Sequence, residues 1–326
     1  MKILVCDHYT PEALSRLHGI GEVKKAKNFQ PTTEELEGVE ALLVRSRTKV
    51  SEALLLQAPQ LKYVITATSG FDHIDFLACE KAAVQVAYTP EANADSAAEH
   101  TLALILNLVR SINTGDRLIR KHEWKEHLPK THSLKDLQLG IVGLGRIGQR
   151  VAKLAKAFGM HIVAHDPYVT PETFKQLGVE PLSLIEVLLS SDVITLHVPM
   201  TKETRYLINH QTLEHINPDA YLINVARGDL IDETELAIKM EKGLLKGAAL
   251  DVFEKEPLPQ ESRLRSLKNV LLTPHVGAYC IDAFARGSEL AVDELLYMLE
   301  VQKSPSRLPL AAGWFESWKK TLAPKK

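Results

Sequence analysis

Three side chains in the last third of the sequence have the types needed for proton transfer on an anionic substrate. Arg227 follows the apolar run YLINVA, Glu256 follows GAALDVFEK, and His275 follows NVLLTP. Histidine has an ordinary pKa of about 6.5, so it can give or take a proton near neutrality, and a neighbouring carboxylate favours its protonated form. Arginine binds a planar carboxylate through two parallel hydrogen bonds. Together these residue types predict acid–base chemistry on a carboxylic acid.

The positions of these residues predict that they meet. Each follows a strand-like run, and 29 and then 19 positions separate them. In an open α/β sheet, ligands bind outside the carboxyl ends of the strands, so side chains that follow successive strands can converge. Asp251 ends the GAAL run and is expected at the same edge. Taken alone, His275 could also be a structural histidine or a metal ligand. No histidine has a second ligand at metal-binding spacing, so no metal site is predicted.

The stretch LGIVGLGRIGQRVAKLAKAFGMHIVAHD has the pattern of a dinucleotide-binding site. Gly143, Gly145 and Gly148 form G-x-G-x-x-G between an apolar run and a helical pattern. The first glycine permits a tight turn, the second lets a pyrophosphate approach the backbone, and the third lets helix and strand pack closely. The start of the helix offers amide donors and a positive dipole end to the phosphates.

The residue that follows the next strand-like run selects between the two nicotinamide cofactors. This run, HIVAH, ends at Asp166, 18 positions beyond Gly148. Asp166 is expected to accept hydrogen bonds from the adenosine ribose hydroxyls. Its charge would repel a 2′-phosphate, and the following Pro167 and Tyr168 provide no compensating arginine. The sequence therefore predicts NAD rather than NADP.

Strand-like and helix-like runs alternate along the chain and must position these residues. KILVC, ALLVRS, KYVIT and QVAY lie in the first ninety residues, a long helical run covers 95–119, and a second series begins at QLGIV. This alternation predicts βαβ units and the α/β class, with mainly parallel, doubly wound sheets. A chain of 326 residues is long enough for two domains, each with its own core.

The composition excludes several classes of protein. With 45% hydrophobic and 25% charged residues, it is that of an ordinary soluble protein, and a net charge of −2 gives no basis for nucleic-acid binding. No apolar run is long enough for a membrane span or a signal peptide. Cys6, Cys79 and Cys280 are an odd number without a CxxC motif. A reduced, cytoplasmic protein is therefore expected.

Five motifs together resemble one enzyme family along nearly the whole chain. VGLGRIGQ, HVPMTKETRYLI, INVARGDLID, ALDVFEKEP and TPHVGA match, in order, the motifs of the D-isomer-specific 2-hydroxyacid dehydrogenases. The resemblance implies that Arg227 binds the substrate carboxylate and polarises the reacting carbonyl. It implies that Glu256 is the carboxylate beside His275, the general acid–base, and that Glu254 is a bystander. Asp251 would hold the nicotinamide carboxamide.

The resemblance also implies a discontinuous domain layout and a set of NAD contacts. A Rossmann NAD-binding domain, residues 95–286, would be inserted in a flavodoxin-like substrate domain of residues 1–94 and 287–326, with the active site in the cleft between them. Val198 and Pro199 would lie beside the nicotinamide. The full set of implied NAD contacts is Ser69, Gly143, Gly145, Arg146, Ile147, Gly148, Asp166, Val198, Pro199, Thr204, Val225, Ala226, Asp251, Gly277 and Ala278.

The first domain resembles the phosphoglycerate and erythronate-4-phosphate dehydrogenase branches of the family. LLVRSRTKV and ITATSGFDHID carry that likeness. The expected substrate contacts are Arg45, Ser46, Thr66, Ser69, Gly70, Arg227 and Tyr279. Arg45 is expected to bind a phosphate, or else to be a surface arginine; Tyr279 would contact substrate, or else only pack. A 3-phosphoglycerate dehydrogenase is favoured, although many have arginine where this chain has Thr66. An erythronate-4-phosphate dehydrogenase and a glyoxylate- or hydroxypyruvate-type enzyme are the alternatives.

The family further implies a homodimer, with His100 on a helix that lines the subunit interface in a structural role. A non-enzymatic alternative is an NAD-sensing binding module similar to the C-terminal-binding-protein co-repressors. The tail from Ser304 is expected to be a weakly ordered end whose Trp314, Phe315 and Trp318 pack on the body of the protein.

Overall fold

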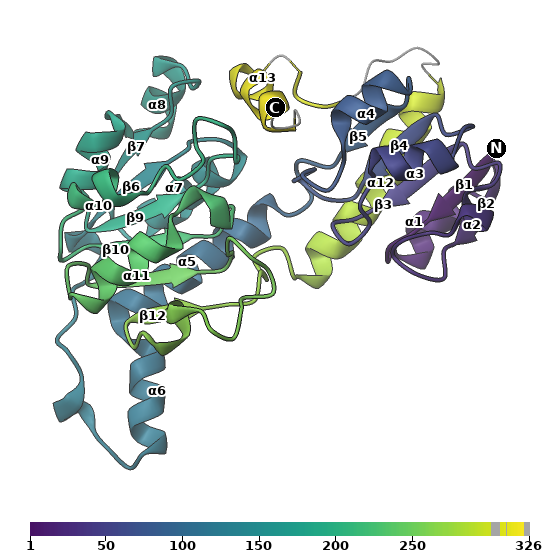
Figure 1. The fold of residues 1–326 in the computed structure, drawn as a ribbon. Helices are drawn as coiled ribbons and strands as arrows, with labels where there is room; N and C mark the ends of the chain where they lie inside the picture. The colour runs from purple at the N-terminus through teal and green to yellow at the C-terminus, as the bar shows by residue number, and fades with distance from the viewer. Residues whose placement is uncertain (301–306, 311, 323–326) are drawn as a thin grey trace. The chain divides into compact units, whose positions relative to one another are not determined.

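The protein consists of two compact units. The computed structural model describes residues 1–300, 307–310 and 312–322. The first unit holds Met1–Ala94 and Ala278–Lys326, and the second unit holds Asp95–Gly277. Each unit is built on one parallel sheet with helices packed against it (Figure 1). The predicted α/β class with two parallel-sheet domains is therefore confirmed.

The first unit has a five-stranded sheet in the order β2-β1-β3-β4-β5, which is the flavodoxin-like order. Its strands are β1 (Lys2–Val5), β2 (Glu22–Lys25), β3 (Ala41–Val44), β4 (Tyr63–Thr66) and β5 (Gln85–Tyr88). Its helices are α1 (Pro11–Ser15), α2 (Thr33–Leu36), α3 (Glu52–Gln57), α4 (Phe76–Lys81), α12 (Ile281–Glu300) and α13 (Gly313–Leu322).

The second unit has a seven-stranded sheet in the order β12-β11-β10-β9-β6-β7-β8. This is the Rossmann order with one additional strand. Its strands are β6 (Gln138–Val142), β7 (His161–His165), β8 (Glu180–Pro181), β9 (Val193–Leu196), β10 (Tyr221–Asn224), β11 (Gly247–Leu250) and β12 (Val270–Leu272). Its helices are α5 (Ala94–Arg110), α6 (Ile112–Arg120), α7 (Arg146–Ala157), α8 (Pro171–Leu177), α9 (Leu184–Ser190), α10 (His210–Glu214) and α11 (Glu233–Glu241), with short 3-10 helices at Lys125–His127, Leu134–Asp136, Gly228–Leu230 and Arg263–Ser266.

The sequences of the inner strands explain why they form parallel sheets. The strands β3 (ALLV), β9 (VITL) and β11 (GAAL) are buried at every position. Strands covered on both faces need continuous rather than alternating apolar residues. Local signals fix where the helices begin: in α9, Ser183 and Glu186 form a reciprocal capping box.

The second boundary between the units lies nine positions before the predicted one. The chain returns to the first unit at Ala278 rather than at residue 287. The reason is that α12 packs along its length on α1, β4 and β5 of the first unit. Within it, Ala291, Val292, Leu295 and Met298 are buried in the same core as Ile3 and Ile65.

The C-terminal tail contains a helix that packs on the first unit, where a weakly ordered end was expected. In α13, Phe315 and Trp318 are buried in one core cluster with Phe71 and Phe76. The Trp318 ring lies edge-on to Phe71, with centroids 4.5 Å apart. The expected packing of these aromatic side chains is therefore observed. Of the tail, 304–306, 311 and 323–326 lie outside the described residues.

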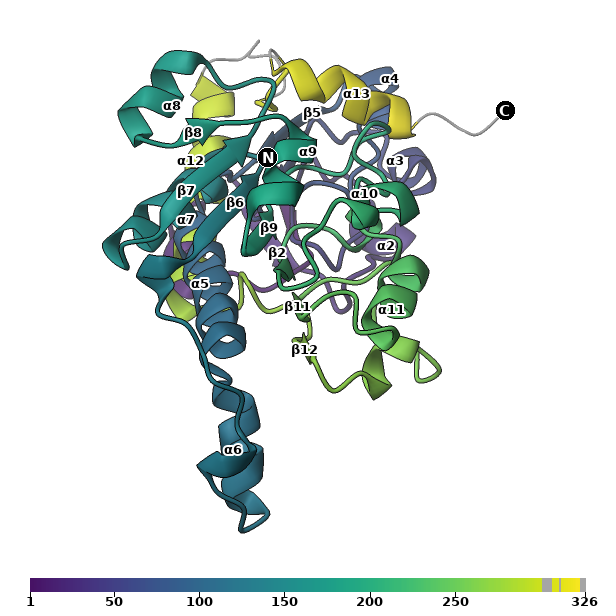
Figure 2. The same ribbon diagram turned by 90° about the vertical axis from the view of Figure 1, so that its left-hand side faces the viewer.

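Helix α5 is followed by α6, which extends beyond the sheet of the second unit in both views (Figures 1 and 2). This extension exposes three large apolar side chains: Ile112 is 57% exposed, Ile119 56% and Trp124 63%. Neither α5 nor any other helix of the described residues is long and apolar enough to cross a membrane.

Candidate active site

The loop after β6 has the geometry of a pyrophosphate-binding turn. Gly143 has a φ of +97°, and an added Cβ would lie 2.7 Å from the carbonyl carbon of His197. A Cβ on Gly148 would lie 2.1 Å from the carbonyl oxygen of Gly143. At Gly145 a Cβ would meet nothing within 4 Å, and no side chain caps the start of α7 there. Open space beside uncapped amides fits a pyrophosphate.

Asp166 follows β7 and faces this loop. Its Oδ2 accepts a hydrogen bond from the Leu144 amide at 2.8 Å, and its Oδ1 accepts one from the Tyr168 amide at 2.9 Å. These bonds fix the carboxylate beside the turn that would hold the pyrophosphate. Asp166 is only partly buried, so its remaining lone pairs can accept ribose hydroxyls.

Residues after β9 and β10 complete the face expected to bind the cofactor. The Val198 side chain lies beside Gly143, and the Thr204 hydroxyl donates to the Pro199 carbonyl at 2.7 Å. Arg146 and Ile147 open α7, and Val225 and Ala226 follow β10. These residues all belong to the second unit, whereas Ser69 and Ala278 belong to the first.

His197 is a partly buried histidine next to this face. Its Nε2 lies 3.0 Å from the Thr195 hydroxyl, and burial lowers the pKa of its imidazole to about 3. Its Nδ1 is buried and has no hydrogen-bond partner among the described residues. A neutral histidine with an unpaired nitrogen beside Val198 fits a site that is completed by a polar cofactor group.

His275 and Glu256 form a close pair in the second unit. The Nδ1–H of His275 donates to Glu256 Oε2 at 2.7 Å, and Glu256 Oε1 accepts from the Phe253 amide at 3.1 Å. Burial acts to raise the pKa of Glu256, but the hydrogen bonds from His275 and Phe253 and the charges of His275 and Arg227 outweigh it, so the pKa lies below its ordinary value. The pair leaves the Nε2 atom of the half-exposed His275 for proton transfer.

The turn that carries His275 is held by Asp251. The backbone of His275 is left-handed, with a φ of +53°, which is strained for a residue with a side chain. The Asp251 carboxylate accepts from the Thr273 hydroxyl at 2.6 Å and from the amides of Val276 and Gly277 at 2.9 and 2.8 Å. Asp251 is 1% exposed; burial acts to raise its pKa, but these bonds and one from His100 lower it to about 2.

Helix α5 supports the same turn from behind. His100 Nε2 lies 3.3 Å from both Asp251 Oδ1 and the Thr273 hydroxyl. One turn earlier in the helix, the Ser96 hydroxyl donates to the Gly277 carbonyl at 2.8 Å. Both contacts are structural, which agrees with the structural role expected for His100. Sequence reasoning gave no signal for Ser96.

Arg227 follows β10 and is positioned by a buried amide. Asn224, 1% exposed, donates from Nδ2 to the Arg227 carbonyl at 2.8 Å and accepts at Oδ1 from the Ala226 amide at 3.0 Å. The residue after Arg227, Gly228, lies against the backbone of Phe253 and Glu254, and the charge of Arg227 lowers the pKa of Glu256, so Arg227 lies near the loop of Glu256 in the same unit. Sequence reasoning missed Asn224, although a polar residue ending a buried strand is a signal for it.

Gly228 lets the loops after β10 and β11 touch through their backbones. A Cβ at this position would lie 1.9 Å from the Phe253 carbonyl carbon and 2.3 Å from the Glu254 nitrogen. No side chain can be accommodated there without moving one loop. This contact brings the loop with Arg227 against the loop with Glu256, and it too was missed from the sequence.

The expected substrate contacts of the first unit follow β3 and β4. Arg45 is partly buried, so it is not a surface arginine. Its Nη2 donates to the Phe284 carbonyl at 2.8 Å, and its guanidinium lies 4.4 Å above the Phe284 ring. Burial lowers the pKa of Arg45, and its Nε has no hydrogen-bond partner among the described residues. Ser46, by contrast, is exposed.

Thr66, Ser69 and Gly70 mark the end of β4. Thr66 is fully buried, and its hydroxyl bonds Thr68 at 2.6 Å and His73 Nε2 at 3.0 Å. The Thr68 hydroxyl donates to the Gly70 carbonyl at 2.7 Å and so shapes the turn that was expected to hold a carboxylate. Tyr279, at the start of the returning segment, is 89% exposed.

The sequence of the second unit matches a known family model. Residues 102–277 match the model described as D-isomer specific 2-hydroxyacid dehydrogenase, NAD binding domain. The chain is 37% identical over 302 residues to a D-3-phosphoglycerate dehydrogenase of Methanocaldococcus jannaschii, covering 92% of this chain and 57% of that protein. It is 40% identical over 296 residues to the Bacillus subtilis D-3-phosphoglycerate dehydrogenase, covering 90% and 56%. The chain thus spans little more than half the length of these relatives.

Solved structures of about the same length are also similar. A Thermus thermophilus protein is 35% identical, with a TM-score of 0.83 over 94% of this chain and 99% of that one. The D-lactate dehydrogenase of Aquifex aeolicus, solved with NAD and lactic acid, is 31% identical, with a TM-score of 0.80 over the whole of both chains.

Proposed function

The chain belongs to the family of D-isomer specific 2-hydroxyacid dehydrogenases, and we propose that it is an NAD-dependent oxidoreductase that interconverts a D-2-hydroxy acid and a 2-keto acid. The observation that carries this proposal is the His275–Glu256 pair at 2.7 Å, next to Arg227. The uncapped turn at Gly143–Gly148 and the carboxylate of Asp166 support NAD as the cofactor. An acid–base pair, a carboxylate-binding cation and a dinucleotide turn in one unit are what this reaction needs.

The chain's own residues supply proton transfer and orientation. When bound, NADH provides the hydride that reduces the carbonyl carbon. Arg227 binds the substrate carboxylate and polarises the carbonyl oxygen, and His275 delivers a proton from Nε2 to that oxygen. Glu256 stabilises the protonated imidazole through Nδ1. In the oxidation direction, His275 takes the proton from the hydroxyl instead.

We further propose that the substrate is a phosphorylated acid of the 3-phosphoglycerate type. The curated relatives are named D-3-phosphoglycerate dehydrogenases. Arg45, whose Nε has no hydrogen-bond partner among the described residues, is the proposed phosphate contact. Arg227 is the proposed carboxylate contact of the second unit, and Ser46, Ser69, Gly70 and Tyr279 are the candidate substrate contacts that the first unit offers. The fully buried Thr66 instead holds the turn after β4 through its bonds to Thr68 and His73. Erythronate 4-phosphate and unphosphorylated acids remain the alternatives to be tested.

A steady-state assay with NADH tests both levels of this proposal. We expect 3-phosphohydroxypyruvate to be reduced with a kcat/KM at least tenfold above those of pyruvate and glyoxylate, because a bound phosphate adds charge-assisted hydrogen bonds of roughly 1.5–3 kcal/mol. Faster reduction of the phosphorylated 2-keto acid derived from erythronate 4-phosphate would keep the substrate class and replace the substrate. Faster reduction of an unphosphorylated acid would contradict the substrate class. Absence of turnover with all of these acids would contradict the enzymatic function and favour the NAD-sensing alternative.

The cofactor choice is tested at Asp166. In Asp166→Asn, we expect the affinity for NADPH relative to that for NADH, given by the ratio of the two association constants, to rise roughly tenfold. The reason is that the charge that repels a 2′-phosphate is removed. Equilibrium titrations of both cofactors measure this ratio, and Asp219→Asn on the same unit is a control. Equal affinity of the unmodified protein for both cofactors would contradict the proposed role of Asp166.

We also propose a cytoplasmic homodimer. The exposed apolar side chains of Ile112, Ile119 and Trp124 on the α6 extension support an interface there. Cys6, Cys79 and Cys280 are free thiols, which suits a reducing compartment. A small-molecule acid and NAD are the other proposed partners.

A further inference from the structure

Three neighbouring loops carry residues proposed for cofactor binding and catalysis. They follow β9, β10 and β11 and hold Thr204, Arg227 and Glu256 respectively. A misplacement of about 1 Å at such groups is costly to catalysis, so these loops must be fixed to one another. Tyr206 and Glu254, which have no part in the proposed reaction, make connections that fix them.

Tyr206 links the loop after β9 to the other two loops. Its backbone is left-handed, with a φ of +49°, which is strained for an aromatic residue. Its N–H donates to the Asp229 carbonyl at 2.8 Å, and its carbonyl accepts from Asn209 Nδ2 at 2.9 Å. Held in this conformation, the Tyr206 hydroxyl donates to Glu254 Oε2 at 2.9 Å.

Glu254 carries the connection into the loop of Glu256. Its Oε1 accepts from the Glu233 amide at 2.8 Å, and its own amide donates to Glu233 Oε1 at 2.7 Å. This reciprocal pair ties the loop after β11 to the start of α11, while Tyr206 ties it to the loop after β9. Glu254 is therefore bonded on both of its carboxylate oxygens, two positions before Glu256.

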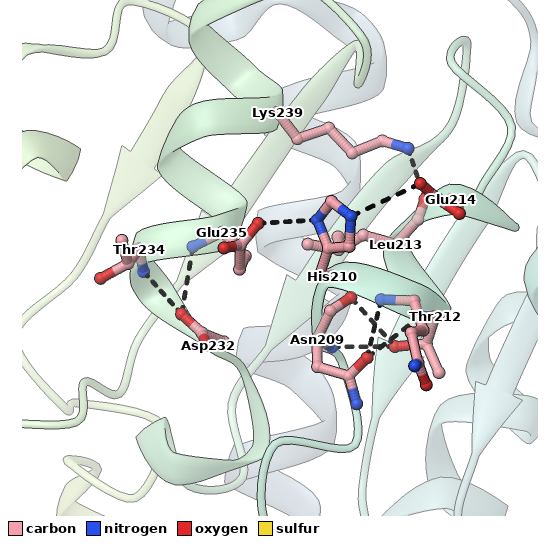
Figure 3. Close-up of polar contacts among 10 residues, drawn as sticks. Asn209, His210, Thr212, Leu213, Glu214, Asp232, Thr234, Glu235 and Lys239 are labelled. Carbon is pink, nitrogen blue, oxygen red and sulfur yellow. Dashed lines mark hydrogen bonds and ion pairs between the residues drawn. The ribbon is translucent and has the colours of Figure 1, made fainter.

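The two helices behind these loops are themselves linked (Figure 3). Asn209 caps α10, accepting from the amide of Thr212 at 3.2 Å, and Asp232 caps α11. The ring of His210 lies between Glu235 of α11, at 3.0 Å, and Glu214 of α10, at 3.6 Å. The His210–Glu235 contact thus joins α10 and α11, the helices that follow Tyr206 and adjoin Glu254.

We propose that Tyr206 and Glu254 are positioning residues that hold the 253–256 loop so that Glu256 reaches His275. The inference rests on the proposed function only because that function gives the His275–Glu256 pair its catalytic role. It follows from three facts: Glu254 is fixed through both oxygens, the Gly228 and Phe253 backbones are in contact, and Glu256 accepts from the Phe253 amide within the same loop. Glu254 is therefore more than the bystander that the sequence implied.

The test is a double-mutant cycle of Tyr206→Phe and Glu254→Ala in the full chain. Each single variant is expected to lower kcat/KM for the best 2-keto acid roughly fivefold to tenfold, because a hydrogen bond to a charged group is lost. The double variant is expected to be no worse than the poorer single variant, since both residues act through one contact. The alkaline limb of the kcat/KM profile is expected to move to lower pH, because His275 loses the carboxylate that favours its protonated form.

Lys255→Ala is the matched control. Lys255 lies in the same exposed loop, and its side chain makes no hydrogen bond or ion pair with the other described residues, so its loss should leave kcat/KM and the pH profile unchanged. Fully additive losses in the cycle would overturn the proposal. A loss of kcat/KM with an unshifted pH profile would assign both residues to general stability and would also overturn it.

A second measurement does not depend on turnover. The Nδ1–H proton of His275 is hydrogen-bonded to Glu256, and its proton resonance is identified by its absence in His275→Gln. We expect this resonance to be sharp in the wild type and in Lys255→Ala, and to broaden by exchange with water in Tyr206→Phe. If the wild type reduces no 2-keto acid, the proposed function fails while this measurement still decides the positioning role. An unbroadened resonance in Tyr206→Phe would overturn it.

Discussion

Replacing His275 with glutamine is expected to lower kcat for 2-keto acid reduction by about 10²–10⁴-fold, the usual contribution of a positioned general acid. Glutamine keeps a donor and an acceptor of similar size but cannot transfer the proton. The dissociation constant for NADH, measured by fluorescence titration, is expected to change less than about threefold, because the pyrophosphate turn and Asp166 are remote in sequence and do not contact His275. Retention of more than a tenth of wild-type kcat would contradict the assignment.

Glu256→Gln provides the matched comparison for His275. The substituted amide could still accept from Nδ1 but would carry no charge, so we expect a smaller loss than for His275→Gln and an alkaline limb at lower pH. The sign for stability follows from the lowered pKa of Glu256. The pair stabilises the folded state above the ordinary glutamate pKa of about 4.3, and this contribution is lost as the pH falls through the lower folded-state value. Thermal unfolding of wild type and Glu256→Gln should therefore converge in acid.

The parts of the site that were predictable depend on local rules. The turn at Gly143–Gly148 is encoded by three glycines: close contacts exclude a side chain at Gly143 and Gly148, and Gly145 leaves open space beside the backbone. Arg227, Glu256 and His275 were predictable because each follows a buried strand, and parallel strands end at one edge of the sheet. Neither argument needs knowledge of which distant segments touch.

The supporting residues depend on contacts between loops, which have no local pattern. Gly228 is needed because the Phe253 backbone passes against it, and nothing in the sequence near Gly228 reveals that neighbour. Tyr206 adopts a left-handed backbone that its residue type disfavours, and its bonds to Asp229, Asn209 and Glu254 hold it there. The resemblance implied a nicotinamide contact for Asp251, but the bonds that its carboxylate accepts from the amides of Val276 and Gly277 had no signal in the sequence.

The fold showed the same division between local and distant information. Most strands of the two sheets were visible as apolar runs, but β2 (EVKK) and β8 (EP) were not. The return to the first unit at Ala278 was not visible either, because α12 packs on strands about two hundred positions earlier in the chain. Helix α13 was missed because its stability comes from Phe315 and Trp318 packing on Phe71 and Phe76 rather than from its own sequence.

Replacing Arg227 with lysine is expected to lower kcat/KM for the 2-keto acid by about 10²–10³-fold while leaving the NADH dissociation constant within about threefold. A guanidinium can bind a carboxylate through two parallel charged hydrogen bonds, each contributing roughly 1.5–3 kcal/mol, and an ammonium cannot reproduce that geometry. Most of the loss should appear in kcat, because the same group polarises the carbonyl as negative charge develops on its oxygen. Steady-state kinetics at varied keto acid concentration separate the two parameters.

Any effect of Arg227→Lys on the loop after β10 must be distinguished from its effect on carboxylate binding. Arg227 Nη1 also donates to its neighbouring Ala226 carbonyl at 2.7 Å, so a lysine could loosen the backbone as well as the substrate. Asn224, which donates to the Arg227 carbonyl, does not depend on the side chain and should keep the loop in place. Arg265→Lys is the control, since Arg265 likewise donates to a backbone carbonyl, that of Pro259 at 2.8 Å, but lies on the exposed surface. If Arg227→Lys and Arg265→Lys had the same small effect on kcat/KM, Arg227 would not be the residue that binds the carboxylate. If Arg227→Lys unfolds at the same temperature as the wild type but loses most of its kcat, the role of Arg227 is in the reaction and not in stability.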